Sequence, residues 1–259
     1  MLTLHRAALV LPDPADPTAP SIADGAVLVQ GELIAALGPY GELTAGHPRA
    51  RLRDWGDALL TPGLRNPYGQ WLLEYAYHPD PREELGDAPV PGGLVGPSDL
   101  TDLTGSGGPV GPVGPVDEAR CGASARRGLQ RMLGFGVTAV AGPFERAAVR
   151  TAMARSGLTA LPGSDGLPGV EGPLDPLAVL PLAAAAWGRL AVGGRADFAV
   201  FRPGGALGSR TRAAGGEGAW FGVAPEADGV GSDVGAGTGP RPGGCLATVL
   251  AGRLVYRRR

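Results

Sequence analysis

Few residues of this chain can bind a metal or take part in hydrolytic chemistry. The sequence has three histidines, His5, His47 and His78. His5 falls in the first expected strand and His47 in a Gly-His-Pro turn, so we expect both at the surface rather than in a site. His78 can be combined with Asp80 and Asp165 in a hypothetical metal site, because zinc binds three or four converging ligands.

An aromatic cluster surrounds an acidic residue shortly before His78. Trp71, Tyr75 and Tyr77 are closely spaced around Glu74. Aromatic rings beside a carboxylate can line a small-molecule pocket, but the same rings can also form the edge of a packed core. The sequence leaves both interpretations open.

The two cysteines, Cys121 and Cys245, match no metal-ligand spacing and no disulfide framework. We therefore expect two reduced thiols, which is the usual state in the cytosol. A nucleophilic pair of Cys121 with His78 has no support in the spacing.

Composition and charge exclude several classes of function. The chain has 259 residues, of which 44% are hydrophobic, so one large domain or two small ones are expected. A net charge of −2 provides no surplus of basic residues for binding nucleic acid or an anionic membrane surface. No run of about 18 apolar residues is present, so we expect no membrane span and a cytoplasmic location. All basic residues other than histidine are arginines.

The pattern of the N-terminal part predicts several short strands. Residues 2–11 form an expected strand, and residues 26–38 an expected β-hairpin that turns at Gln30-Gly31-Glu32. A further short strand is expected at residues 50–54. Short strands separated by turns predict a sheet or a sandwich.

The middle of the chain changes to a helical period. Asp117 can cap a helix that Gly134 would close in the left-handed conformation. A buried strand at residues 137–141, a helix at 145–156 and a strand at 158–161 follow. Strand, helix and strand in this order predict a βαβ unit with parallel strands.

Residues 59–74 contain the motif around which these elements are arranged. The segment resembles the passage from sandwich to first barrel strand in the amidohydrolase superfamily, where Pro-Gly-(Leu or Phe)-x-(Asn or Asp)-x-His-x-His supplies two metal ligands. Pro62, Gly63 and Asn66 fit this pattern, as does Leu64. The histidine positions hold Tyr68 and Gln70, which are poor substitutes for neutral imidazole. Because the chain has no lysine, the carboxylated-lysine bridge of some two-metal amidohydrolases is also excluded.

Two further segments carry the same resemblance. Residues 188–201 are similar to the family's re-entry into its sandwich, Gly-x-(Leu or Ile)-x-x-Gly-x-x-Ala-Asp, in which Asp197 is implied to be structural. Residues 246–256 are similar to its closing strand pair, with a turn at Ala251-Gly252. Residues 129–140 are similar to the segment around the second barrel strand.

The resemblance suggests one catalytic residue. Residues 161–165, Leu-Pro-Gly-Ser-Asp, resemble the end of the last barrel strand, where the family's aspartate binds metal and moves protons. A carboxylate there accepts a proton from metal-bound water, so Asp165 is the candidate catalytic residue. The alternative is a plain Ser-Asp-Gly turn.

The expected fold class is α/β, with a small β-sandwich made from both chain ends. We expect residues 1–62 and 189–259 to form this composite domain and residues 63–188 to form a barrel remnant with a Pro/Gly-rich linker at 79–116. A second Gly-rich stretch spans residues 203–244. A closed barrel takes about 250 residues, so the space between the sandwich arms holds about three βα units.

The resemblance is to imidazolonepropionase-like amidohydrolases, which implies hydrolysis of non-peptide carbon–nitrogen bonds in small cyclic molecules. Loss of the histidine pair predicts a degenerate member that acts as a binding or partner protein, with Tyr68, Gln70, Trp71 and Glu74 lining a ligand site. The alternative is an active hydrolase or deaminase with zinc or another divalent metal on Asp165 and His78. A small-molecule ligand and a homo-oligomer or protein partner over the open barrel are expected, with no nucleic acid and no membrane.

Overall fold

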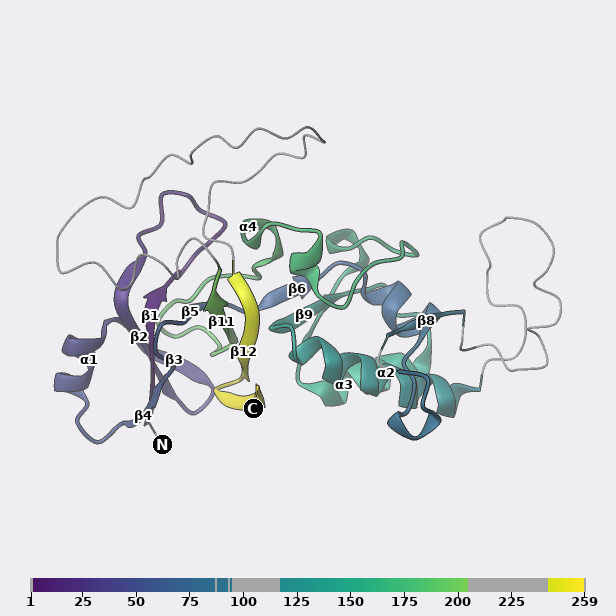
Figure 1. Cartoon of the computed structure of the whole chain (residues 1–259), viewed down its shortest axis with the longest axis horizontal. Helices are drawn as coiled ribbons and strands as arrows, with labels where there is room; N and C mark the ends of the chain where they lie inside the picture. Colours follow the sequence, from purple (N-terminus) through teal and green to yellow (C-terminus); the bar gives the residue numbers. More distant parts are fainter. Residues whose placement is uncertain (1, 87, 93, 95–116, 205–241, 259) are drawn as a thin grey trace.

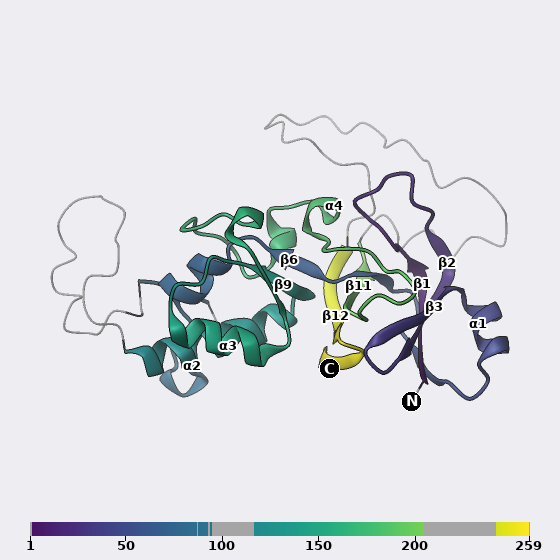
Figure 2. The ribbon, with the colours of Figure 1, turned by 180° about the vertical axis from the view of Figure 1, so that it is seen from behind.

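The computed structural model describes residues 2–86, 88–92, 94, 117–204 and 242–258. A large β-sheet forms one end of the molecule, and a smaller sheet with two long helices forms the other (Figures 1 and 2). The α/β class predicted from the sequence is confirmed.

The large sheet is built from both ends of the chain, as predicted. Its strands follow the order β13-β12-β11-β5-β1-β2-β3, and β4 pairs with β1 beside β5. The bounds are β1 (Leu2–Val10), β2 (Ile22–Gln30), β3 (Leu33–Pro39), β4 (Arg51–Asp54), β5 (Leu59–Pro62), β11 (Phe198–Pro203), β12 (Pro242–Leu250) and β13 (Arg253–Arg257). The short helix α1 (Tyr40–Gly46) lies between β3 and β4.

A hydrophobic core lies on one side of this sheet. Apolar residues of β1, β2, β5, β11 and β12 pack together there, with Phe198 and Leu60 fully buried. His5 also lies in this core, fully buried, with its ring edge-on to Phe198 at 4.9 Å and stacked on Trp55 at 6.1 Å. The prediction that His5 is a surface residue was therefore wrong, because contacts with distant aromatic residues decide its depth.

The two predicted hairpins are confirmed. β2 and β3 turn at Gly31, with φ of 62°, and β12 and β13 turn at Ala251 and Gly252, with φ of 47° and 72°. The turns touch, because a Cβ atom on Gly252 would lie 2.1 Å from the carbonyl oxygen of Gly31. The two ends of the described chain therefore meet in the same sheet.

The smaller sheet contains three parallel strands in the order β10-β9-β6. Its elements are β6 (Leu64–Asn66), a π-helical turn (Trp71–Tyr75), α2 (Glu118–Leu133), β9 (Val137–Ala141), α3 (Ala147–Ser156) and β10 (Thr159–Leu161). The predicted βαβ unit is confirmed, with Asp117 as N-cap of α2 and Gly157 in the left-handed conformation after α3.

The glycine that ends α2 was predicted incorrectly. Gly134 is right-handed, with φ of −66°, and donates its N–H to Arg131. The left-handed residue is Gly136, with φ of 84°, because the last turn of the helix continues for two more residues. This shift brings Gly136 against the ring of Phe201 and the methyl group of Ala199 in β11.

The start of the predicted linker is regular in the described residues. A 3-10 turn at Pro81–Glu83 carries a capping box with Asp80, and β8 (Val90–Pro91) pairs with β7 (Ala76–Tyr77). The rest of that linker, including the Gly-Pro-Val triplets, and most of 203–244 lie outside the described residues. A 3-10 turn (Pro176–Ala178) and α4 (Leu182–Ala185) precede β11.

Within the described parts of the chain, no helix combines the length and the apolar character needed to cross a membrane. The subdivision into residues 1–62 with 189–259, and 63–188, stays a prediction.

Gly136→Ala should destabilise the protein by roughly 2–4 kcal/mol. A Cβ atom there would lie 2.8 Å from the Phe201 ring and 2.9 Å from Ala199, at a φ that side chains rarely adopt. The matched control is Gly31→Ala, with a similar positive φ but nothing within 4 Å, which should cost only about 1 kcal/mol. Chemical denaturation measures both, and equal losses would contradict the close packing of β11 on this turn.

Candidate functional site

The carboxyl end of β6 is the place where the resemblance locates a metal site. Asn66, the last residue of the strand, is fully buried, and its side-chain amide both accepts and donates hydrogen bonds. Its Oδ1 accepts from the N–H of Tyr68 at 2.9 Å, and its Nδ2 donates to the carbonyls of Pro173 and Leu174 at 3.0 and 3.1 Å. Asn66 therefore fixes the loop after β6 and ties it to a later segment of the chain.

That later segment covers the strand end. The N–H of Leu167 donates to the carbonyl of Pro67 at 2.8 Å. Gly172 lies directly against the face of Tyr68, because a Cβ atom there would be 2.1 Å from the ring. Gln70 is buried at the start of the π-helical turn. The positions of the two expected histidines are thus occupied by a packed ring and a buried amide.

Glu74 has a structural partner. Its side chain is 3% exposed, and its Oε1 accepts from the backbone N–H of Arg146 at 2.7 Å, directly before α3. Burial raises the pKa of Glu74, and hydrogen bonds from the backbone of Arg146 and Glu145 oppose this rise. Glu74 therefore caps the N-terminus of α3, where a carboxylate is favourable.

The aromatic cluster is part of the packed core. Trp71 and Tyr68 pack against the hydrophobic core between the smaller sheet and α2. Tyr77 is 3% exposed, and its hydroxyl group donates to Glu83 at 2.6 Å. The guanidinium group of Arg120 lies over its ring at 4.5 Å. These contacts favour the core-edge interpretation over a pocket around Trp71 and Glu74.

His78 is buried between the π-helical turn and α2. Its Nε2 lies 2.8 Å from the carbonyl oxygen of Leu72, which requires a proton on Nε2, and its Nδ1 is buried with no partner among the described residues. Burial lowers the pKa of His78 to about 4, although its hydrogen bond to Leu72 acts in the opposite direction. Gly128 of α2 faces the ring closely. His78 is therefore a neutral core histidine at pH 7.

Asp165 lies in a 3-10 turn, Gly163–Asp165, after β10. Its backbone carbonyl accepts from Nη1 of Arg65 at 3.4 Å. The preceding strand pairs with β9 and not with β6, so it occupies the third position of the sheet. The last strand of a closed barrel would instead pair with the first, so the pairing favours the turn interpretation of this segment.

The residues at the carboxyl end of β6 do not fit a metal ion. No group of three or more His, Cys, Asp or Glu side chains with suitable geometry occurs among the described residues, so His78, Asp80 and Asp165 are not brought together as a site. Burial raises the pKa of the Cys121 thiol to about 11, which leaves it protonated and unreactive at neutral pH.

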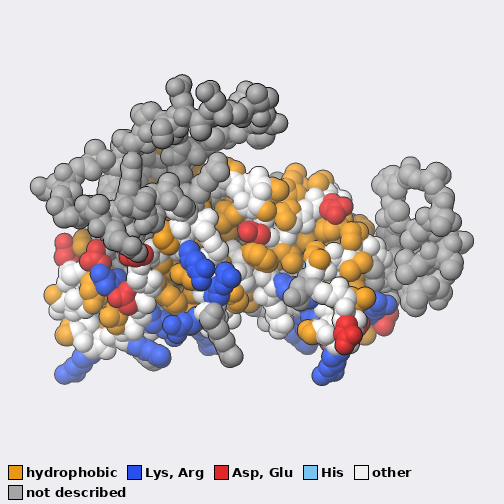
Figure 3. Space-filling view, in the orientation of Figure 1, with side chains coloured by type: hydrophobic (Ala, Val, Ile, Leu, Met, Phe, Trp, Pro, Cys, Tyr) orange, Lys and Arg blue, Asp and Glu red, His pale blue; other side chains and the backbone are white. Residues whose placement is uncertain are grey.

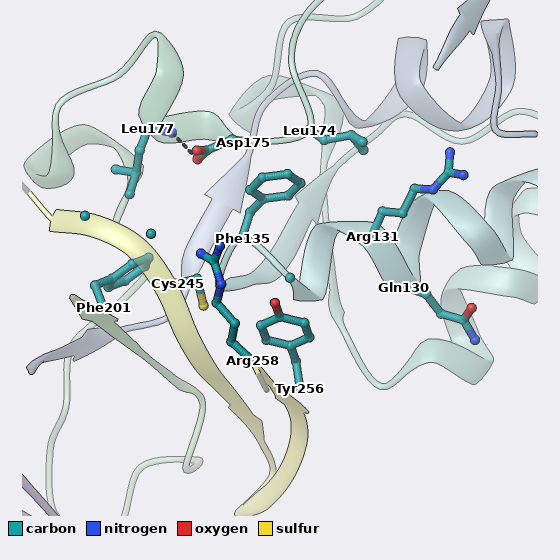
Figure 4. Close-up of a pocket in the computed structure, with 13 residues that line it drawn as sticks. Gln130, Arg131, Phe135, Leu174, Asp175, Leu177, Phe201, Cys245, Tyr256 and Arg258 are labelled. Carbon is teal, nitrogen blue, oxygen red and sulfur yellow. Dashed lines mark hydrogen bonds between the residues drawn. The ribbon is translucent and has the colours of Figure 1, made fainter. Parts of the chain in front are cut away.

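A cleft that was not predicted lies between the large sheet and the end of α2. Its volume is about 450 Å³, and its walls come from α2, the turn before Pro176, β11, the start of β12 and the end of β13 (Figure 4). The residues that carry its chemical character are Phe135, Leu174, Asp175, Cys245, Tyr256 and Arg258. No local signal in the sequence links Arg258 to Phe135 or Asp175.

Comparisons with known proteins support the resemblance found in the sequence. Residues 25–50 match a family model described as imidazolonepropionase-like composite domain, bacteria. An imidazolonepropionase of Pyrobaculum arsenaticum is 38% identical over 52 residues, which is 20% of this chain and 13% of that protein. The predicted similarity to imidazolonepropionase-like amidohydrolases is confirmed, and it rests on the N-terminal strands.

Solved structures similar to this chain include deaminases. A guanine deaminase from Bradyrhizobium japonicum is 17% identical, with a TM-score of 0.39, over 62% of this chain and 34% of the other. A zinc-bound adenosine deaminase from Xanthomonas campestris is 20% identical, with a TM-score of 0.39, over 61% and 33%. The chain thus spans about a third of the length of these structures.

Glu74→Leu and Glu74→Gln should affect stability differently. Leucine leaves the N–H of Arg146 buried without an acceptor and should cost about 1–3 kcal/mol, whereas glutamine keeps an acceptor oxygen. Because folding raises the pKa of Glu74, the wild-type protein should lose stability relative to Glu74→Gln as the pH rises from the unfolded value of 4.5 through the raised folded value.

Glu118 provides the matched control. It accepts from the N–H of Ala148 in the same helix terminus at 3.1 Å, but its side chain is 56% exposed. Water replaces an exposed acceptor, so Glu118→Leu should cost less than about 1 kcal/mol. Denaturant titrations from pH 4 to 8 measure all three variants, and an equal cost for Glu74→Leu and Glu118→Leu would refute the capping role of Glu74.

Proposed function

We propose that this chain is a catalytically degenerate amidohydrolase-like protein that serves as a binding or partner protein. Its similarities are to hydrolases and deaminases, whose activity on carbon–nitrogen bonds is the background for this proposal. The observation that carries it is the covered end of β6, where Tyr68 and Gln70 replace the expected histidines and Gly172 packs on the Tyr68 ring.

The covering segment removes the space as well as the ligands. The side-chain amide of Asn66 donates to the carbonyls of Pro173 and Leu174, and the N–H of Leu167 donates to the carbonyl of Pro67. A substrate and a metal ion would have to displace these hydrogen bonds to reach the end of β6. A truncated barrel is part of the same proposal, since the described residues contain three parallel strands in this sheet where a closed barrel has eight.

The alternative of an active hydrolase or deaminase on Asp165 and His78 has less support. His78 is fully buried, and its Nε2 proton is directed at a backbone carbonyl. Asp165 lies in the turn after β10, and its contact with β6 is made by its backbone carbonyl, which accepts from Nη1 of Arg65 at 3.4 Å. A general acid–base role requires hydrogen-bond reach to a substrate, which the burial of His78 does not allow.

The purified protein should contain far less than one zinc, iron, manganese or nickel ion per chain. It should be expressed without a histidine tag and without added metal, and its metal content measured by mass spectrometry. The physical reason is that zinc requires three or four converging ligands, which the residues around β6 do not supply. One tightly held ion per chain would refute the proposal.

Restoring both histidines provides the control for this measurement. Tyr68→His together with Gln70→His should leave the metal content low, since a third ligand is still required. If the wild-type protein does hold a metal ion, His78→Gln and Asp165→Asn tested singly will identify the residue that binds it.

The partner that we propose is a second copy of the chain, bound at the edge of β10 that pairs with no other strand of the described residues. The opposite edge of the smaller sheet is covered, because Ala186 forms a bridge with Leu64 and the N–H of Trp187 donates to Gly63. Apolar side chains are exposed on the smaller unit (Figure 3), and in the segment that follows β10 Leu167 is 44% and Val170 48% exposed. An uncovered parallel strand edge favours association.

The molar mass in solution should increase with concentration in light-scattering chromatography, and Ala160→Pro should suppress the increase. The carbonyl of Leu161 faces β9, where it accepts from Gly142, so strand alternation places the N–H of Ala160 on the free edge. Proline removes that N–H and leaves the pairing with β9 intact. A monomer at every concentration would refute the second copy as partner.

A further inference from the structure

We propose that the cleft between the large sheet and α2 binds a small aromatic carboxylate, with Arg258 holding the carboxylate and Phe135 and Tyr256 enclosing the ring. This inference deepens the proposed function, because it gives the binding role a site and a class of ligand. It uses none of the residues at the end of β6.

The size and position of the cleft suit a small ligand. Its volume of about 450 Å³ lies within the range of about 300–1,000 Å³ that is usual for ligand pockets, which also favour the junction between two structural units. The walls come from five separate segments of the chain, one of them β11, which contributes Phe201. In Figure 4 the labelled side chains of α2 lie on one side and those of β12 and β13 on the other.

Aromatic and aliphatic side chains form most of the lining. Phe135 and Leu174 pack against the core of the smaller unit, and Tyr256 is half-buried beside them. Figure 4 shows the rings of Phe135 and Tyr256 at different levels of the same opening. Rings arranged in this way bind a planar apolar group through stacked or edge-on contacts.

The charges of the lining select an anion. Arg258 has no carboxylate within ion-pair distance among the described residues, and its backbone N–H donates to Leu246, which anchors it at the end of β13. Figure 4 shows its side chain directed into the opening, toward the level of Phe135. A guanidinium group with free donors binds a carboxylate in a bidentate manner.

Asp175 is the acidic residue that lines the cleft. Its Oδ1 accepts from the N–H of Leu177 at 2.9 Å, so it is engaged in the cap of the following turn. Burial raises the pKa of Asp175, and the hydrogen bond from Leu177 opposes this rise. Among the described residues Asp175 forms no ion pair with Arg258, so it leaves that guanidinium group available to a carboxylate ligand.

Glycine keeps the entrance open. A Cβ atom on Gly244 would lie 2.9 Å from Nη1 of Arg258, so the bare backbone allows the guanidinium group to lie across the start of β12. The thiol of Cys245 stays protonated, because burial raises its pKa to about 11, and it serves as a neutral part of the floor.

The experiment titrates the full chain with benzoate, benzamide and benzamidine by calorimetry. These probes have nearly the same shape and differ in charge. Benzoate should bind at one site with a dissociation constant of about 0.1–5 mM, which is expected for a ligand of this size, and the other two should bind at least tenfold more weakly. Stronger binding of benzamidine, or no binding of benzoate, would overturn the proposal.

Two variants connect the binding to the cleft. Arg258→Gln should weaken benzoate binding at least tenfold, and Arg258→Glu should reverse the preference toward benzamidine. Arg253→Gln is the control, since Arg253 is an exposed residue of β13, the strand that precedes Arg258, and does not line the cleft. Thermal melting confirms that each variant is folded. If benzoate binds equally well to the wild type and to both Arg258 variants, the assigned site is wrong.

The outcome is separable from that of the metal measurement. A metal ion in the protein together with normal benzoate binding would refute the proposal that the site at the end of β6 is degenerate, and would still support the cleft site. A protein without metal that does not bind benzoate would refute the cleft site alone.

Discussion

The antiparallel pairing of β5 with β11 is the interaction on which the rest of the structure depends. It joins residues from opposite ends of the chain, with Pro62 opposite Phe198 and Leu59 opposite Phe201. Directly after it, the N–H of Gly63 donates to Asp197 and the N–H of Trp187 donates to Gly63. Because the backbone is held on both sides where β6 begins, the direction of β6, and through it that of β9 and β10, is set by the large sheet.

The same junction separates two kinds of surface. At the carboxyl end of β6 the chain folds back on itself, and Asn66 and Tyr68 are used for packing. Next to β12 the two units diverge and leave a lined cleft. At the first place the buried amide of Asn66 forms its hydrogen bonds with backbone groups, as buried polar groups generally do. At the second place the exposed Arg258 lines the cleft together with apolar side chains.

The parts of the fold that could be predicted depend on neighbours in sequence. The hairpins and the βαβ unit follow from apolar alternation and from glycines at fixed positions. The burial of His5 depends on Phe198 and Trp55, and the partner of Glu74 is Arg146, both far along the chain. The local motif was enough to identify Tyr68 and Gln70 as replacements of the expected histidines. The packing of Gly172 on Tyr68 and the position of Arg258 in the cleft depend on distant segments, so the sequence could not predict them.

The contact between the turns at Gly31 and Gly252 has a consequence for biosynthesis. The ribosome completes β1 to β5 long before β11 to β13 emerge, so the nascent N-terminal strands wait with the edge of β5 unpaired. Sheet closure is then a long-range event that follows translation of the last hairpin, and such non-local pairings form slowly. An unpaired strand edge favours aggregation, so this interval is the stage of folding at which the chain is most exposed to it.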